Sequence, residues 1–213
     1  MVNYNGKFIV FEGGEGTGKT TQIALLEKRL MEQGFDVYLT REPGGSGCVI
    51  GEKIRTLLKD PQHREMVPEA ELFLFLASRA QHVKQLILPK LQQGTIVICD
   101  RFFGSTLAYQ HFGRGLFNLD EVKRINNFAT QGLEPDLTAL LDIEPEKGIG
   151  RKQDTIENDR LDSEALEFHH KVRNGYLTLA QIRPNWSIIP ADDTVENIHE
   201  QLWHNIGQLL DTN

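Results

Sequence analysis

Cysteine, positive charge and long apolar runs are all scarce in this sequence. Its 213 residues include two cysteines, Cys48 and Cys99, too few for a disulfide framework and typical of a reducing compartment. Lysine and arginine total 23 against 30 aspartates and glutamates, and the net charge of −7 argues against a nucleic-acid-binding protein. No apolar stretch is long enough to span a membrane, and the N-terminus lacks a signal-peptide pattern. We therefore expect a cytoplasmic protein without a membrane segment.

Internal repeats, low-complexity tracts and linkers are absent from the sequence as well. A composition of 39% hydrophobic and 25% charged residues is ordinary for a globular protein, and the length suffices for one sizeable core. We expect residues 1–213 to form a single domain.

The most specific motif is a glycine-rich segment near the N-terminus. Gly13-Gly14-Glu15-Gly16-Thr17-Gly18-Lys19-Thr20 fits Gly-x-x-x-x-Gly-Lys-[Ser/Thr], the P-loop that binds nucleoside triphosphates such as ATP. An apolar run precedes it and a helical pattern follows, and in this context backbone N–H groups converge on phosphate oxygens. Lys19 is expected near the β and γ phosphates, and the Thr20 hydroxyl is expected to ligate Mg²⁺. A glycine-rich turn without a ligand is the alternative.

Short apolar runs alternate with helical patterns along the chain, which favours a parallel sheet with helices on both faces. We predict an α/β fold of the P-loop NTPase type, with three layers, five parallel strands and a lid. The expected strands are Phe8–Phe11, Val37–Thr40, Thr95–Cys99, Leu137–Ile143 and Ser187–Pro190. The expected helices are Lys19–Gln33, Ile50–Lys59, Glu69–Gln92, Leu119–Gln131, Leu161–Ile182 and Val195–Leu210.

Ligands of such sheets bind beyond the carboxyl ends of the strands, where several charged residues occur. Arg41 and Glu42 follow the second expected strand, and Arg55 lies on the next helix. Guanidinium groups bind phosphate oxygens in a fork, so the two arginines suit a second phosphate site. A solvated turn and a surface arginine explain the same residues equally well.

The third expected strand ends in Asp100-Arg101. An aspartate in this position is typical of the carboxylate that approaches Mg²⁺, directly or through water, in P-loop proteins. Arg101 is placed to reach a phosphate. The alternative is a surface Asp–Arg pair at a strand end.

Phe75 and Arg79 are four residues apart on an expected helix and therefore share a face. An aromatic ring beside a guanidinium suits a nucleobase. The helix also carries a long apolar stripe, however, so spacing alone favours Phe75 as a core residue.

Together these motifs resemble the bacterial thymidylate kinases, which are P-loop nucleoside-monophosphate kinases, over nearly the whole chain. The strongest block is Cys99-Asp100-Arg101-Phe102-Phe103-Gly104-Ser105-Thr106-Leu107-Ala108-Tyr109-Gln110. Further matching blocks are Thr40-Arg41-Glu42-Pro43-Gly44-Gly45, Phe75-x-Ala77-x-Arg79, Pro135-Asp136-Leu137 and Asp159-Arg160-Leu161.

The resemblance implies phosphorylation of dTMP to dTDP by MgATP, on the route to dTTP, by a homodimer. It implies that Phe75 stacks on thymine, that Arg79 hydrogen-bonds the carbonyl edge of the base, and that Tyr109 lies against the sugar. The implied dTMP site consists of Glu15, Arg41, Glu42, Arg55, Phe75, Arg79, Arg101, Thr106, Tyr109 and Gln110. With the P-loop assignments, the predicted catalytic residues are Lys19, Asp100 and Arg101, and the predicted magnesium ligands are Thr20 and Asp100, directly or through water.

One segment departs from the family pattern. Similar enzymes with a glutamate in the P-loop usually carry several basic residues in a mobile lid after the fourth strand, whereas residues 148–160 here hold only Arg151, Lys152 and Arg160. We predict that Arg151 is the main lid charge on the transferred phosphoryl group, assisted by Arg160 or Lys152. An ordinary solvated helix face is the alternative.

Three other functions are compatible with a P-loop. One is a kinase for another nucleoside or nucleotide. A second is a GTPase-type switch, which the absence of an Asn-Lys-x-Asp segment disfavours. The third is a non-catalytic homologue, which the intact Lys19, Thr20 and Asp100 disfavour.

Overall fold

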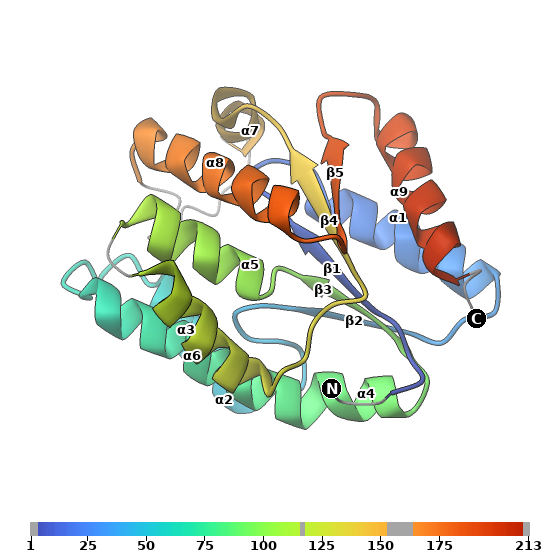
Figure 1. The fold of residues 1–213 in the computed structure, drawn as a ribbon, viewed down its shortest axis with the longest axis horizontal. Coiled ribbons are helices and arrows are strands. Elements are labelled where there is room, and N and C mark those ends of the chain that lie inside the picture. Colours follow the sequence, from blue (N-terminus) through green and yellow to red (C-terminus); the bar gives the residue numbers. More distant parts are fainter. Residues whose placement is uncertain (1–3, 116–117, 153–163, 211–213) are drawn as a thin grey trace.

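A five-stranded parallel sheet forms the centre of the chain in a computed structural model, which describes residues 4–115, 118–152 and 164–210 (Figure 1). The strands lie in the order β2-β3-β1-β4-β5, and all four neighbouring pairs are parallel. Their bounds are β1 (Phe8–Glu12), β2 (Val37–Arg41), β3 (Ile96–Asp100), β4 (Leu137–Asp142) and β5 (Trp186–Pro190). The predicted fold class is confirmed, and each strand lies within one residue of its expected bounds.

Helices cover both faces of the sheet, which explains why the strands are apolar on both sides. Ile9 and Phe11 of β1 pack on the face covered by α1 (Lys19–Glu32) and α9 (Val195–Leu210). Phe8 and Val10 pack on the opposite face, under α3 (Pro68–His82), α6 (Leu119–Thr130) and α8 (Leu166–Ile182). Two further helices, α2 (Val49–Lys59) and α7 (Pro145–Lys152), follow β2 and β4.

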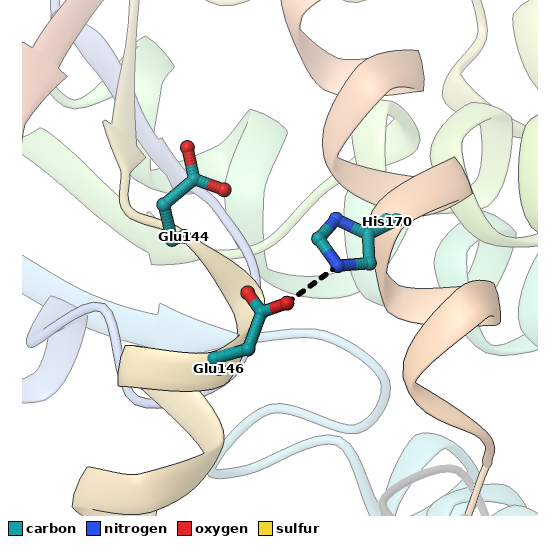
Figure 2. Close-up of side chains that lie close together, drawn as sticks. All are labelled: Glu144, Glu146 and His170. Carbon is teal, nitrogen blue, oxygen red and sulfur yellow. Dashed lines mark hydrogen bonds and ion pairs between the residues drawn. The ribbon is translucent and has the colours of Figure 1, made fainter.

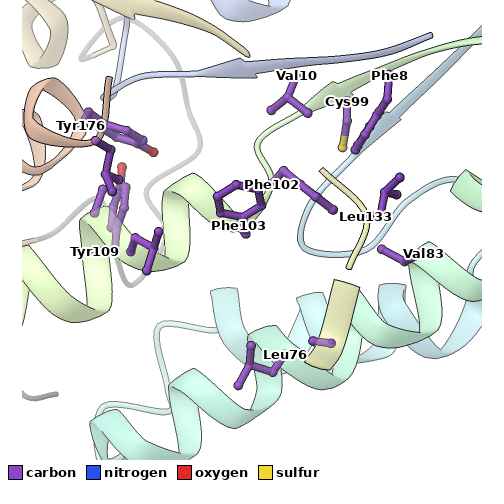
Figure 3. Packing of buried hydrophobic residues seen from close by; sticks show 14 of the residues in the cluster. Phe8, Val10, Leu76, Val83, Cys99, Phe102, Phe103, Tyr109, Leu133 and Tyr176 are labelled. Atoms are coloured by element: carbon purple, nitrogen blue, oxygen red, sulfur yellow. The ribbon is translucent and has the colours of Figure 1, made fainter. Parts of the chain in front are cut away.

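Aromatic packing in the larger core fixes the chain just after β3 (Figure 3). The Phe102 ring meets the Phe8 ring edge to face, with centroids 5.0 Å apart, and meets Phe103 at 5.5 Å. Because Phe102 directly follows Asp100-Arg101, this packing holds the backbone that presents those two residues.

The expected long helix Glu69–Gln92 is present but contains a wider turn. It runs as α3, a π-helical segment η1 (Val83–Ile87) and α4 (Leu88–Gln92). Pro89 lies just after the wide turn and has no N–H to donate to the preceding turn of helix. The proline therefore accounts for the local loss of α-helical hydrogen bonding.

The helices differ from expectation in two places: one helical region was not predicted, and one helix begins later than predicted. Residues after Phe102 form α5 (Phe103–Thr106) and a second π-helical segment, η2 (Leu107–Gly113), which the sequence analysis missed because Gly104, Ser105 and Thr106 are weak helix formers. The helix expected from Leu161 begins at Leu166, since Ala165 has an extended backbone; residues 161–163 lie outside the described residues.

Among the residues that are described, no helix is long and apolar enough to cross a membrane.

Candidate functional site

A cavity of about 680 Å³ lies at the carboxyl ends of the strands. Residues that follow all five strands contribute to its walls, as the strand-end rule predicts. It brings together sixteen of the predicted site residues: Glu15, Gly16, Thr17, Gly18, Lys19, Thr20, Glu42, Arg55, Phe75, Arg79, Asp100, Arg101, Thr106, Tyr109, Gln110 and Arg151. Gly13, Gly14 and Arg41 are not among the lining residues.

The P-loop backbone has the form that its glycines permit. Gly13, Gly16 and Gly18 have positive φ angles, and Gly18 is the N-terminal cap of α1. A Cβ atom on Gly16 would lie 1.9 Å from the carbonyl oxygen of Gly148, and one on Gly148 would lie 2.2 Å from that of Glu15. Glycine at both positions therefore lets the P-loop and α7 touch backbone to backbone.

Lys19 is buried against the loop that it follows. Its Nζ donates to the carbonyl oxygens of Gly13 and Gly14, at 3.1 and 2.9 Å. Burial lowers the pKa of Lys19 to about 8, and the positive charge of Arg101 adds to this shift, while Asp100 and Glu15 oppose it. The ammonium group thus lies in a site that favours a nearby negative charge.

Arg101 connects the P-loop to the helix after β3. It has a left-handed backbone, with φ of 68°, and its Nη1 donates to the carbonyl oxygen of Gly13 at 3.0 Å. Its Nη2 donates to Glu15 Oε1 at 2.8 Å, and the Tyr109 hydroxyl donates to the same oxygen at 2.9 Å. Three predicted site residues therefore share one hydrogen-bonded cluster.

A buried carboxylate that the sequence analysis missed supports this cluster from below. Glu12 Oε1 accepts from the backbone N–H groups of Phe102 and Ser105, both at 3.0 Å. Its Oε2 accepts from the hydroxyls of Ser105 at 2.7 Å and Tyr176 at 3.1 Å. Burial raises the pKa of Glu12, and these hydrogen bonds partly offset that rise. A charged residue at the end of an apolar strand, next to a P-loop, was the available signal.

Arg79 is 1% exposed, and four hydrogen-bond acceptors hold its guanidinium at the cavity wall. Its Nε donates to Glu42 Oε2 at 2.7 Å, and its Nη1 donates to Thr106 Oγ1 at 2.8 Å and to Asn126 Oδ1 at 2.5 Å. Its Nη2 donates to the carbonyl oxygen of Phe102 at 3.1 Å. Asn126 lies 47 residues away in the chain, and no motif pointed to it.

The remaining predicted residues divide by location. Phe75 is half-buried and lines the cavity, so the core position that spacing alone favoured is wrong. Arg55 also lines the cavity, and its Nη1 donates to the carbonyl oxygen of Pro43 at 3.0 Å. Arg41 is ion-paired with Glu52 at 3.1 Å, outside the lining residues, and its role in phosphate binding stays a prediction.

Arg151 extends from α7 to the cavity and the turn after β5. Its Nη1 donates to the carbonyl oxygen of Ala191 at 3.0 Å. On the same helix, Lys147 forms an ion pair with Asp192 of this turn. Arg160 lies outside the described residues, as does most of the predicted lid, and the Lys152 side chain is not described.

Two groups of side chains offer oxygen or nitrogen atoms that could bind a metal ion. Asp100 Oδ1 is buried without a hydrogen-bond partner among the described residues, and Thr20 lines the same cavity, so an oxygen-binding cation fits there. The carboxylates of Glu144 and Glu146 lie close to His170 on the surface (Figure 2). Glu146 is paired with His170 at 2.9 Å, and Glu144 with Arg173 at 2.5 Å, so ion pairs account for this cluster.

Comparisons with known proteins agree with the geometry. Residues 11–202 match the family model described as thymidylate kinase. The chain is 53% identical over 176 residues to a thymidylate kinase of Carboxydothermus hydrogenoformans, with 83% of this chain and 85% of the relative covered. It is 47% identical over 212 residues to a thymidylate kinase of Pelobacter propionicus, with 96% and 94% covered. A thymidylate kinase of Exiguobacterium is 43% identical over 199 residues, with 93% and 92% covered.

The lowered pKa of Lys19 predicts a pH-dependent stability. The folded chain, with a Lys19 pKa of about 8, binds this proton less tightly than the unfolded chain, with the ordinary value of 10.5. Charged Lys19 therefore opposes folding below about pH 8, and the cost declines as the pH rises from 8 toward 10.5. We expect the unfolding free energy of the wild type, relative to Lys19→Met, to rise across this window by up to about 1.4 kcal/mol per pH unit.

Urea unfolding at pH 7.5, 8.5 and 9.5 measures this difference. Lys28→Met is the matched control, because Lys28 lies on the same helix with its side chain 74% exposed. A difference between wild type and Lys19→Met that does not change with pH would contradict the assignment.

Proposed function

The chain belongs to the thymidylate kinase family, whose activity is the ATP-dependent phosphorylation of dTMP to dTDP, and we propose where it binds its substrates. Both nucleotides bind in the cavity at the carboxyl ends of the strands. One observation carries this proposal. The cavity is lined at once by the P-loop lysine Lys19 and by the set Phe75, Arg79 and Gln110, which suits a nucleobase. A donor phosphate site and an acceptor base site thus share one space.

We assign the P-loop part of the cavity to ATP. The N-terminus of α1 and Lys19 supply the positive potential that the β and γ phosphates require. Asp193 and Val195, which follow β5, line the same cavity and border the space for the nucleoside of ATP.

We assign the part near α3 and η2 to dTMP. Phe75 offers a half-buried ring on which thymine stacks, and Arg79 donates to a carbonyl oxygen of the base. Tyr109, held by Glu15, lies against the sugar. Arg55 and Arg101 direct positive charge toward the monophosphate, and Arg41 would join them only after leaving Glu52.

The chemistry follows from positions and charges. The acceptor is an oxygen of the dTMP phosphate that is already ionised, so no strong general base is needed. Two anionic nucleotides repel each other, and the cations at the cavity wall reduce that repulsion and bring the phosphates into line. In an acidic chain, these cations must be held locally, and the hydrogen bonds of Lys19 and Arg101 do so.

Magnesium is proposed to accompany ATP, with Thr20 and Asp100 as its protein ligands, directly or through water. The buried Oδ1 of Asp100, which has no hydrogen-bond partner in the described part of the chain, supports this assignment. The ion would neutralise charge on the phosphate oxygens of ATP.

A homodimer is proposed because large apolar side chains are exposed on three neighbouring helices, α2, α3 and α6 (Figure 1). Phe73 is 63% exposed and Phe128 is 87% exposed, and the others are Val49, Ile50 and Leu57. Apolar surface of this kind marks a protein interface. A cytoplasmic location remains part of the proposal.

The first test of the function is an ADP-release assay with ATP and Mg²⁺. Thymidine, deoxyuridine, deoxycytidine and adenosine monophosphates are offered in parallel, and dTMP is expected to give the fastest turnover. Lys19→Ala should reduce this turnover by at least about a hundredfold, because Lys19 faces the transferred phosphoryl group. A preference for another acceptor would keep the P-loop chemistry and overturn the base-site assignment.

The proposed role of Arg151 is tested by Arg151→Ala, which should lower kcat by about a hundredfold or more if the guanidinium stabilises the transferred phosphoryl group. Lys147→Ala is the control, since Lys147 lies on the same helix and contacts the same turn without lining the cavity. Equal losses in the two variants would show that the attachment of α7 matters rather than the charge of Arg151.

The dimer is tested by multi-angle light scattering, which should give a mass of twice 24.2 kDa. Phe73→Lys should produce monomers, because it places a charge in the proposed interface. Ile182→Lys, at an exposed apolar position on α8, should leave the mass unchanged. A monomeric wild type at micromolar concentration would rule the proposal out.

A further inference from the structure

Gln110 is held at the cavity wall by a buried carboxylate. Its amide nitrogen, Nε2, donates to Glu71 Oε1 at 3.0 Å, and both side chains belong to residues that are 1% exposed. Glu71 lies on α3 and Gln110 on η2, so the contact crosses between two helical elements. Gln110 also lines the cavity, which leaves its amide between Glu71 on one side and the ligand space on the other.

Arg114, which is not among the lining residues of the cavity, contacts Glu71 as well. Its Nε and Nη2 lie 3.5 and 3.4 Å from the two carboxylate oxygens of Glu71, and its Nη1 donates to Glu164 at 2.6 Å. Burial lowers the pKa of Arg114, but the two carboxylates outweigh this effect and raise it. The guanidinium therefore stays charged and forms an ion pair with the carboxylate of Glu71.

The chemistry of a carboxylate decides which way the amide of Gln110 faces. An ionised carboxylate only accepts hydrogen bonds, whereas an amide has a donor end and an acceptor end. Glu71 therefore takes the NH₂ end, and the carbonyl Oε1 of Gln110 is the end left for the cavity. Rotation of the amide by 180° would place two acceptors against each other in a buried site, which is unfavourable.

Arg79 presents the complementary group in the same cavity. It has only donors, and of its five N–H groups four serve Glu42, Thr106, Asn126 and Phe102. Facing a base, the wall thus offers a donor from Arg79 and an acceptor from Gln110. A pyrimidine with a carbonyl next to a ring N–H, such as thymine or uracil, matches this pair. Cytosine presents an amino group next to an unprotonated ring nitrogen, and matches neither.

We propose that Glu71 is a specificity-determining positioning residue: through the orientation of the Gln110 amide, it selects imide pyrimidines over cytosine. The inference rests on the proposed function, since it concerns the base of the acceptor nucleotide. It predicts that selectivity is lost when residue 71 is able to donate to Gln110, although residue 71 itself need not contact the substrate.

The test is Glu71→Gln, which keeps the shape of the side chain and adds a donor. With ATP saturating, kcat/KM is measured for dTMP and for dCMP. The ratio of the two is expected to fall at least about tenfold, the effect of losing one correctly oriented buried hydrogen bond. The KM for ATP and the melting temperature are recorded for each variant. Glu69→Gln, on the exposed side of the same helix, is the matched control and should keep the wild-type ratio.

A double-mutant cycle separates a role through Gln110 from a general structural role. Gln110→Met removes the amide, so the further change Glu71→Gln should leave the dTMP-to-dCMP ratio of that variant unaltered. If E71Q does not fold, Glu71→Asp is used in its place. This change shortens the side chain by one methylene and weakens the contact with Gln110, so the dTMP-to-dCMP ratio of kcat/KM should fall about threefold.

The outcomes are distinguishable. A wild-type ratio in folded E71Q or E71D overturns the inference and leaves the proposed function in place. Equal losses of kcat/KM for dTMP and dCMP also overturn it, because only general disruption would act on both alike. A wild type that phosphorylates neither nucleotide overturns the proposed function, and the inference with it.

Discussion

The hydrogen-bonded contact between Arg101 and Glu15 is the interaction on which the rest of the site depends. It joins a residue of the P-loop to the first residue after β3, two segments 86 positions apart in sequence. The same guanidinium reaches the carbonyl oxygen of Gly13, and Tyr109 closes the cluster from η2. The P-loop, the turn after β3 and η2 are therefore joined by one cluster built around a partly buried ion pair.

Such a pair needs support, because a charge removed from water is costly unless it is fully hydrogen-bonded. Glu12 provides that support indirectly by holding the backbone of Phe102 and Ser105, which follow Arg101 in the chain. Phe102 in turn packs on Phe8 of the core. The guanidinium of Arg101 is thus kept in place by the carboxylates of Glu15 and Glu12 and by the packing of Phe102 on Phe8.

Those features that depend on local sequence could be predicted. The P-loop is defined by glycines at fixed spacing, so its position could be read from the motif. The five strands are short apolar runs because both faces of the sheet are buried, and their bounds were predicted to within one residue. The helix at Phe103–Gly113 was missed because its first turn contains residues with poor helix propensity, and tertiary packing overrides that preference. Pattern alone also placed Phe75 in the core, although it lies at the cavity wall.

Features that depend on distant pairing could not be predicted. Glu12 meets Ser105 and Tyr176 across 93 and 164 residues, and Arg79 meets Asn126 across 47. The pairing of Arg41 with Glu52 spans only 11 residues, but the sequence does not show which charged neighbour Arg41 contacts. Burial and partner choice at these positions follow from the folded arrangement of the sheet and its helices.

The contact between Gly16 and Gly148 has a mechanical consequence. Two packed side chains accommodate small displacements by changing rotamers, whereas two backbones in direct contact have no such freedom. Movement of α7 must therefore either carry the middle of the P-loop with it or separate from the loop altogether. The shape of the P-loop is therefore expected to depend on where the first turn of α7 lies.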